Sequence, residues 1–211
     1  FAFFIIVYYL FQGDKAAAGT WPAWFGTMSA VATAFLVIPI VTKLSEKIGK
    51  KNAFIVATLI SIIGYALKWW GFNPANPWLM FLPIPFLSFG IGGLFTLMMS
   101  MTADVCDLDE LNCGERREGM FGAVYWWMVK LGNALAILTS GIVLSMVGFN
   151  EAIDVQSAEA ITNLRIADIL IPVATAIMAI VIVWKYDISE AKSYEIRQAL
   201  IARRGKVKHR E

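Results

Sequence analysis

The sequence contains few of the residues that catalysis and metal binding use. Of its 211 residues only 16% are charged, one is a histidine (His209) and two are cysteines (Cys106 and Cys113), whereas soluble domains carry about 25% charged residues. The cysteine spacing fits neither a CxxC redox motif nor a zinc site, so we expect two free thiols. HExxH and GxSxG motifs are absent from the sequence. An enzyme is therefore the least favoured class, and we expect no cofactor, no metal site and no nucleic-acid partner.

What the sequence has in excess is apolar residues in long runs. Hydrophobic residues make up 58% of the chain, which is typical of a protein in a lipid bilayer. We predict an all-α membrane protein with a six-transmembrane-helix bundle over residues 1–186. Residues 1–11 are shorter than the roughly 20 residues that cross a bilayer, so we expect the chain to begin inside a truncated first helix. The predicted helices are residues 1–11, 22–42, 53–70, 78–102, 120–148 and 166–186.

The basic residues predict the orientation of the bundle. Alternate loops and the C-terminal stretch hold fourteen lysines and arginines on one side, and the other side holds three, Lys15, Lys68 and Arg165. Because loops rich in lysine and arginine stay in the cytoplasm, we expect a multi-pass protein of the cell (inner) membrane with a cytoplasmic C-terminus. Five tryptophans gather toward the opposite interface. Residues 187–211 are predicted to form a short helix on the membrane surface that continues as a disordered basic tail containing a solvated His209.

Among the predicted helices, we expect residues 78–102 to form a bent or broken one. Pro83 and Pro85 lie near its start and three glycines, Gly90, Gly92 and Gly93, lie in its middle. Proline removes a backbone donor and glycine allows close helix approach. The same residues also fit simple packing points, as do Gly132 and Gly141 in the next helix.

Two charged motifs lie between apolar segments on the basic side. The first, TKLSEKIGKK, resembles the inter-helix signature of the major facilitator superfamily. The second, the acidic motif, is residues 103–119 and has only Arg116 and Arg117 as local counter-charges. Both motifs also fit solvated loops. A calcium loop is rejected because Leu111 and Asn112 occupy positions that need an oxygen ligand and a glycine. We predict a charge network, or gate, of Glu46, Lys47, Gly49, Lys50, Lys51, Asp104, Asp107, Asp109, Glu110, Arg116, Arg117 and Glu118.

A lysine, Lys130, interrupts the apolar segment 120–148. It lies about 16 Å along the helix from Gly119, close to the middle of a hydrocarbon core of about 30 Å. A charge there costs on the order of 2.5–3.5 kcal/mol unless it is paired or hydrated. Trp126, Trp127 and Asn133 share its helical face. Indole rings stack on sugars, while the ammonium and the amide bond hydroxyl or carboxylate groups. The alternatives are that the tryptophans only pack against lipid or other helices, and that Lys130 forms a structural ion pair with an acid buried in another part of the protein.

The stretch ADVCDLDE…GERREGMFGAVYWWMVKLG resembles the glycoside–pentoside–hexuronide:cation symporter family, the melibiose-permease-like branch of the major facilitator superfamily. The resemblance covers essentially the whole chain and implies the C-terminal half of a twelve-helix fold that works by alternating access. It implies that Lys130 helps to couple sugar to Na⁺ or H⁺, and that the carboxylates binding the ion belong mainly to an N-terminal half. The implied partners are that half, the lipid bilayer and a sugar or glycoside. The alternatives are a symporter of lysolipids or other organic solutes and a non-transporting membrane scaffold or binding protein.

Overall fold

The computed structural model describes residues 1–150 and 153–208, with side chains up to residue 204, and every regular element in these ranges is helical. The elements are α1 (Ala2–Ile5), η1 (Ile6–Leu10), α2 (Lys15–Ala18), α3 (Trp21–Val31), η2 (Ala32–Val37), α4 (Ile38–Ile48), α5 (Lys50–Gly71), η3 (Pro77–Phe81), α6 (Ile84–Cys113), α7 (Glu118–Met146), α8 (Ala158–Trp184) and α9 (Glu190–Lys208).

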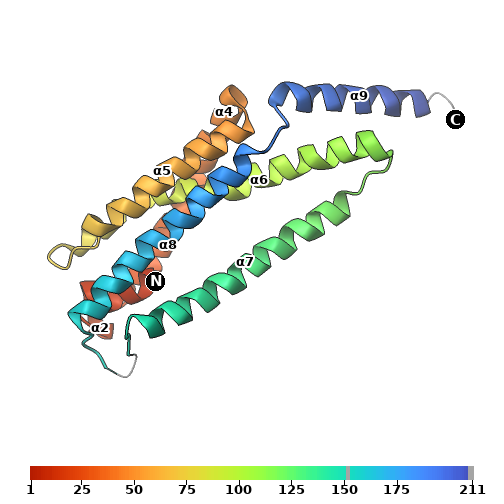
Figure 1. Ribbon diagram of the computed structural model, residues 1–211. Coiled ribbons are helices and arrows are strands. Elements are labelled where there is room, and N and C mark those ends of the chain that lie inside the picture. The colour runs from red at the N-terminus through yellow and green to blue at the C-terminus, as the bar shows by residue number, and fades with distance from the viewer. Residues whose placement is uncertain (151–152, 209–211) are drawn as a thin grey trace.

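Five stretches are long and apolar enough to cross a membrane: Lys15–Ile48, Lys50–Gly71, Pro77–Cys113, Glu118–Met146 and Ala158–Trp184. They run back and forth along one another (Figure 1), so the predicted all-α membrane fold is confirmed. Residues 1–11 form the short α1 and η1. We call the end with the α4–α5, α6–α7 and α8–α9 connections the basic end. The opposite end, which carries Trp21 and Trp78, is the tryptophan end.

The helices differ from the predicted segments mainly at the basic end. The α3–α4 helix continues to Ile48 rather than residue 42, and α6 continues to Cys113 rather than residue 102. Hydropathy shows where the lipid-contacting part of a helix ends. The helical hydrogen bonds themselves continue through the charged residues that follow, until a glycine ends the helix. Gly114 adopts a left-handed φ of 85° and closes α6. Asp104, Asp107, Asp109 and Glu110 therefore lie in a helix, and Arg116 and Arg117 lie in the turn between α6 and α7. Helix α8 begins at Ala158 rather than residue 166.

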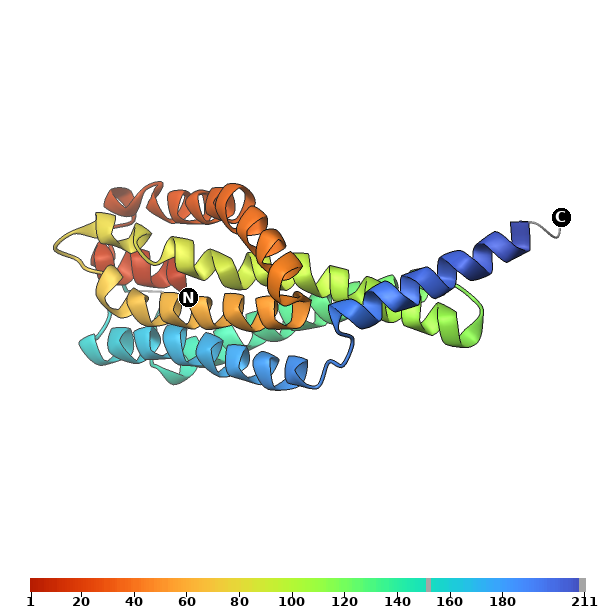
Figure 2. The same ribbon diagram turned by 90° about the horizontal axis from the view of Figure 1, so that it is seen from above.

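The most visible bend lies outside the segment that was predicted to be bent or broken (Figure 2). Pro83 and Pro85 stand at the start of α6, where proline is well tolerated, and α6 then runs unbroken to Cys113. Instead, the chain from Trp21 to Ile48 contains a π-helical stretch, η2, with Pro39 shortly after it, and changes direction there (Figure 2). Proline and π-bulges are established causes of helix kinks. The predicted segment 78–102 is broken only near its start, where η3 ends at Phe81 and Leu82 and Pro83 precede α6. It has no break at its three glycines.

Two apolar clusters hold the bundle together. Toward the basic end, Val37, Phe54 and Leu97 belong to a buried cluster shared by α4, α5, α6 and α8. Toward the tryptophan end, Ile5 and Phe72 belong to a second cluster that also includes Met80 of η3 and Leu164 of α8. Lipid tails are about as apolar as leucine side chains. Close packing, rather than transfer out of water, therefore stabilises these contacts.

Close approach of α5 and α6 depends on glycine. A Cβ atom on Gly64 would lie 2.7 Å from the backbone nitrogen of Leu87, and one on Gly93 would lie 2.8 Å from Cβ of Ala57. The glycines of α6 are therefore packing points. Gly132 and Gly141, by contrast, have no atom within 4 Å of an added Cβ, so they make no close contact in this part of the chain.

Gly64→Ala is expected to lower the free energy of unfolding by about 1–3 kcal/mol, because backbone atoms cannot move aside without separating the helices. Gly132→Ala is the matched control. It should leave stability unchanged or raise it by up to about 1 kcal/mol through helix propensity. Thermal unfolding of the detergent-solubilised protein measures both, and equal midpoints for the two variants would contradict this account of α5–α6 packing.

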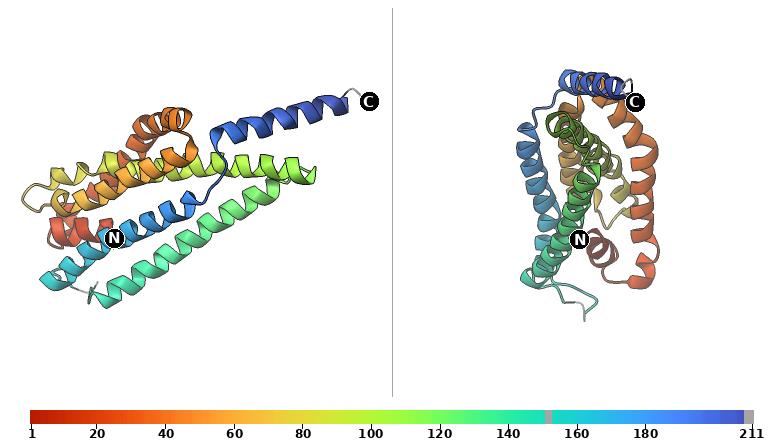
Figure 3. Two further views of the ribbon diagram at one scale, coloured as in Figure 1. Left: turned by 45° about the horizontal axis from the view of Figure 1, so that its top comes forward. Right: turned by 90° about the vertical axis from the view of Figure 1, so that its right-hand side faces the viewer.

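The C-terminal helix α9 is longer and more ordered than predicted. It runs from Glu190 to Lys208 and passes over the end of α6 at the basic end (Figure 3), with Ile196 and Leu200 buried. The predicted disordered tail is therefore helical up to Lys208, and its side chains bond α6 rather than standing free. His209 lies outside the described residues.

Candidate functional site

The buried carboxylate of Asp104 on α6 joins three other segments at the basic end. Asp104 is 2% exposed. Its Oδ2 lies 2.5 Å from Nζ of Lys50 on α5 and accepts a hydrogen bond from the hydroxyl of Tyr186 at 3.3 Å. Its Oδ1 accepts one from Ser193 on α9 at 2.8 Å, and Arg197 lies 3.7 Å away. Burial, and secondly the charge of Asp104, raise the pKa of the Tyr186 phenol, so this phenol remains a donor.

A second acid on α6, Glu110, binds three arginines. Arg204 on α9 donates to both of its carboxylate oxygens, at 2.8 and 2.7 Å. Arg116 donates to Oε2 at 2.9 Å, and Arg203 donates to the backbone carbonyl at 3.0 Å. Bidentate arginine–carboxylate contacts fix orientation as well as charge. Glu110 therefore ties α9 to the α6–α7 turn.

Three further acids of the motif are paired with the two arginines of the α6–α7 turn. Arg116 donates to Asp107 at 2.9 Å and to Glu118 at 2.8 Å, and Arg117 donates through Nε to Asp109 at 2.8 Å. Hydrogen bonds to Glu118, Glu110 and Asp107 raise the pKa of Arg116, and the one to Asp109 raises the pKa of Arg117. Both guanidiniums remain charged throughout the accessible pH range.

The TKLSEKIGKK segment is almost entirely helical, and only Gly49, at φ 81°, breaks it. Lys50 reaches Asp104, and Lys51 donates to the carbonyls of Trp184 and Tyr186. No ion pair of Glu46 or Lys47 occurs among the described residues; both line a hollow of about 450 Å³ facing the α8–α9 connection. The structure thus brings Lys50 to the acidic motif and leaves Lys47 apart from it.

The predicted substrate residues lie on a helix that is exposed along its length. No residue of α7 is buried, and Trp126 and Trp127 are 48% and 60% exposed. Lys130 and Asn133 are exposed on the same helix. Within residues 1–150 and 153–204 no acid forms an ion pair with Lys130. Asp104, the acid expected nearest to it, is paired with Lys50 instead. Nothing from the described bundle covers the lysine face of α7.

Comparison with known proteins decides the family. A family model described as MFS/sugar transport protein matches residues 2–190. The chain belongs to this family. It is the family of glycoside–pentoside–hexuronide:cation symporters, whose members are transporters rather than enzymes.

Individual symporters match at moderate identity. The glucuronide carrier protein homolog of Escherichia coli is 30% identical over 158 residues, which are 75% of this chain and 34% of that protein. An uncharacterised symporter of Synechocystis is 29% identical, covering 83% of this chain and 33% of its own length. A putative sulfoquinovose importer of E. coli is 29% identical over 74% of this chain and 33% of its length. The chain spans about a third of the length of the curated relatives that it matches.

One buried ion pair of this family member was not predicted from its sequence. Lys68 on α5 and Asp168 on α8 form a salt bridge near the tryptophan end, and they are 5% and 6% exposed. Lys68 was counted with the basic residues of the tryptophan side, because it lies close to the end of its helix. A lone acid within an apolar segment, Asp168, is the signal that points to a partner.

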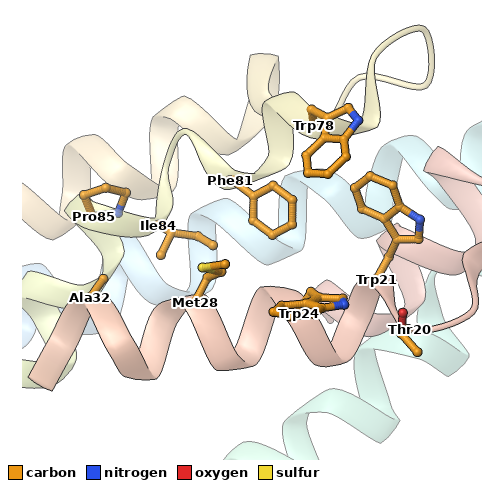
Figure 4. A pocket seen from close by; sticks show the side chains of 9 residues that line it. All are labelled: Thr20, Trp21, Trp24, Met28, Ala32, Trp78, Phe81, Ile84 and Pro85. Atoms are coloured by element: carbon orange, nitrogen blue, oxygen red, sulfur yellow. The ribbon is translucent and has the colours of Figure 1, made fainter.

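The largest cavity described lies at the tryptophan end, away from every predicted site residue. It has a volume of about 680 Å³ and opens between α3 and the start of α6. Figure 4 shows Trp24 and Met28 facing Phe81 and Ile84 across it, with Trp21 and Trp78 at one end. Thr20 supplies a hydroxyl group and the rest of the lining is mainly apolar.

Proposed function

We propose that the chain is the C-terminal six-helix half of a cation-coupled sugar or glycoside symporter that works by alternating access. The observation that carries this proposal is Lys130. It stands within an apolar helix, on an exposed face, without an acidic partner among the described residues. An unpaired ammonium at this depth in a bilayer is costly. A second six-helix half that supplies carboxylates to this face removes that cost.

The coupling ion, Na⁺ or H⁺, binds mainly to the carboxylates of that other half, and Lys130 links their charge to the substrate. A substrate between the halves then reaches Lys130 and Asn133 with its polar groups, and Trp126 or Trp127 with its C–H face. Glucuronide and sulfoquinovose, which the names of two relatives mention, are sugars that bear a carboxylate or a sulfonate group. An anionic sugar is complementary to a lysine and is therefore the first substrate to test.

The basic end faces the cytoplasm in this proposal, as its lysines and arginines favour. The network around Asp104 and Glu110 would then hold the cytoplasmic ends of α5, α6 and α8 together with α9. Contacts between this network and the other half would form when the cytoplasmic side closes and break when it opens. We accordingly propose that the protein resides in the cell (inner) membrane, with a cytoplasmic C-terminus.

The test is uptake by the whole transporter in proteoliposomes under an imposed Na⁺ or pH gradient. A phenyl glucuronide, the matching neutral phenyl glucoside and a lysophospholipid serve as substrates. We expect gradient-driven accumulation of the glucuronide, and no uptake when the 211-residue chain is reconstituted by itself. Accumulation of the lysophospholipid alone would replace the sugar assignment, and uptake by the isolated chain would refute the half-transporter.

A further inference from the structure

Helices α5 and α8 are antiparallel and each bonds the carboxyl end of the other. Lys51, in the first turn of α5, donates to the carbonyls of Trp184 and Tyr186 at 2.6 and 3.0 Å, where α8 ends. Arg165, in the third turn of α8, donates to the carbonyl of Trp69 at 2.5 Å, where α5 ends. Carbonyls in the last turn of a helix have no partner within it, and positive charge is favourable there. The two helices are thus joined at both ends.

The Lys68–Asp168 salt bridge lies just inside one of these joints. Asp168 follows Arg165 by three residues, so both side chains leave the same face of α8 toward α5. Lys68 also stands over the ring of Phe72 at 5.4 Å. Lys68 is the only ion-pair partner of Asp168 within residues 1–150 and 153–204, and no cavity described for this chain includes either residue. The pair is therefore removed both from solvent and from the exposed face of α7.

Apolar packing by itself leaves most of α8 unspecified. Its buried apolar residues are Ala160, Ile161 and Leu164 near its start and Val183 near its end. Between Asp168 and Val183 no residue of α8 is buried. The large exposed side chains there are leucine, isoleucine, valine and methionine, which are similar to lipid in polarity. A buried polar pair between two such helices forms only when the helices are in one particular register, so it can specify that register.

We propose that Lys68 and Asp168 form a helix-docking ion pair, which holds α8 on α5 and takes no part in binding substrate or coupling ion. A charge left without its partner at this place is strongly unfavourable, whereas an apolar pair of similar size packs without penalty. The two charges are consequently needed only together. This separates them from Lys130, whose charge the proposed transport function requires.

The experiment is a double-mutant cycle on the detergent-solubilised protein, read by thermal unfolding. Lys68→Met and Asp168→Val are each expected to lower the midpoint by about 10 °C, and the double variant is expected to regain most of that loss. The exposed pair Lys15–Asp154 is the matched control: its side chains are 62% and 77% exposed. Its single variants should change the midpoint by no more than about 2 °C. Lys130→Met is a second control that should also leave the midpoint unchanged.

A double variant as unstable as the sum of its single variants would overturn the docking pair, as would single variants that match the exposed control. Uptake gives an independent readout. Docking predicts that the double variant, once stable, transports at the rate of the unchanged protein. A stable double variant without uptake would show instead that the two charges serve transport, and that outcome overturns this inference without affecting the proposed symport.

Discussion

Lys130→Ala in the whole transporter is expected to abolish cation-coupled uptake while leaving the protein inserted in the membrane. The side chain lies on an exposed face of α7 without an acid among the described residues, so its removal leaves the described bundle intact. What is lost is the positive charge facing the substrate and the other half. Uptake should fall to the level of empty vesicles, and the amount of protein in the membrane should stay constant.

Lys130→Arg and Lys15→Ala are the controls for that result. Arginine keeps the charge but is larger, so part of the uptake should remain. Lys15 is an exposed lysine at the tryptophan end, paired with Asp154 at 3.6 Å, and its loss should leave uptake unchanged. Undiminished accumulation by the Lys130→Ala protein would refute the role assigned to this lysine.

Asp104→Asn is expected to lower the free energy of unfolding by about 3–5 kcal/mol, because one partner of a buried ion pair is removed and the other stays. The stranded group is Lys50, whose side chain is 12% exposed. Ser193 and Tyr186 lose a charged acceptor in the same substitution. We therefore also expect faster backbone hydrogen exchange in α9. Denaturant titration of the purified protein gives the first quantity and exchange mass spectrometry the second.

Asp187→Asn is the matched control for Asp104. Its carboxylate is 96% exposed and lies 3.4 Å from Lys192. Exposed pairs of this kind contribute about 0–1 kcal/mol, so stability and the exchange of α9 should stay nearly unchanged. If Asp104→Asn were no more harmful than Asp187→Asn, the buried carboxylate would not be what joins α5, α6 and α9.

Sequence reasoning found the spans because an apolar helix in lipid must be apolar over most of its surface. It could not find their ends, because helices such as α6 continue beyond the lipid through residues that are good helix formers. The same property extends α9, which is rich in alanine, glutamate, lysine and arginine, to Lys208. The kink at η2 depends on a change of hydrogen-bond pattern that composition does not show, although Pro39 beside it is a residue that commonly kinks helices.

The charged motifs were predicted as clusters but not as pairs. The separation of Lys50 from Asp104 is 54 residues, and helical spacing carries no information on contacts between distant segments. Lys68 and Asp168 lie 100 residues apart. Each lies near an end of its predicted membrane helix, where a charged side chain can commonly reach the interface and needs no buried partner. Only the antiparallel placement of α5 and α8 brings them together. The contacts between these acids and α9 could not be predicted either, because the C-terminal segment was expected to lie on the membrane surface.

The length of α6 has a mechanical consequence. Its 30 residues make a rod of about 45 Å, against a hydrocarbon core of about 30 Å, so its last turns project from the membrane as a rigid lever with α9 fastened alongside. Any tilt of the bundle is magnified at the tip of such a lever. A fluorophore at Tyr194, an exposed position on α9, would therefore report small rotations of the helices as large displacements.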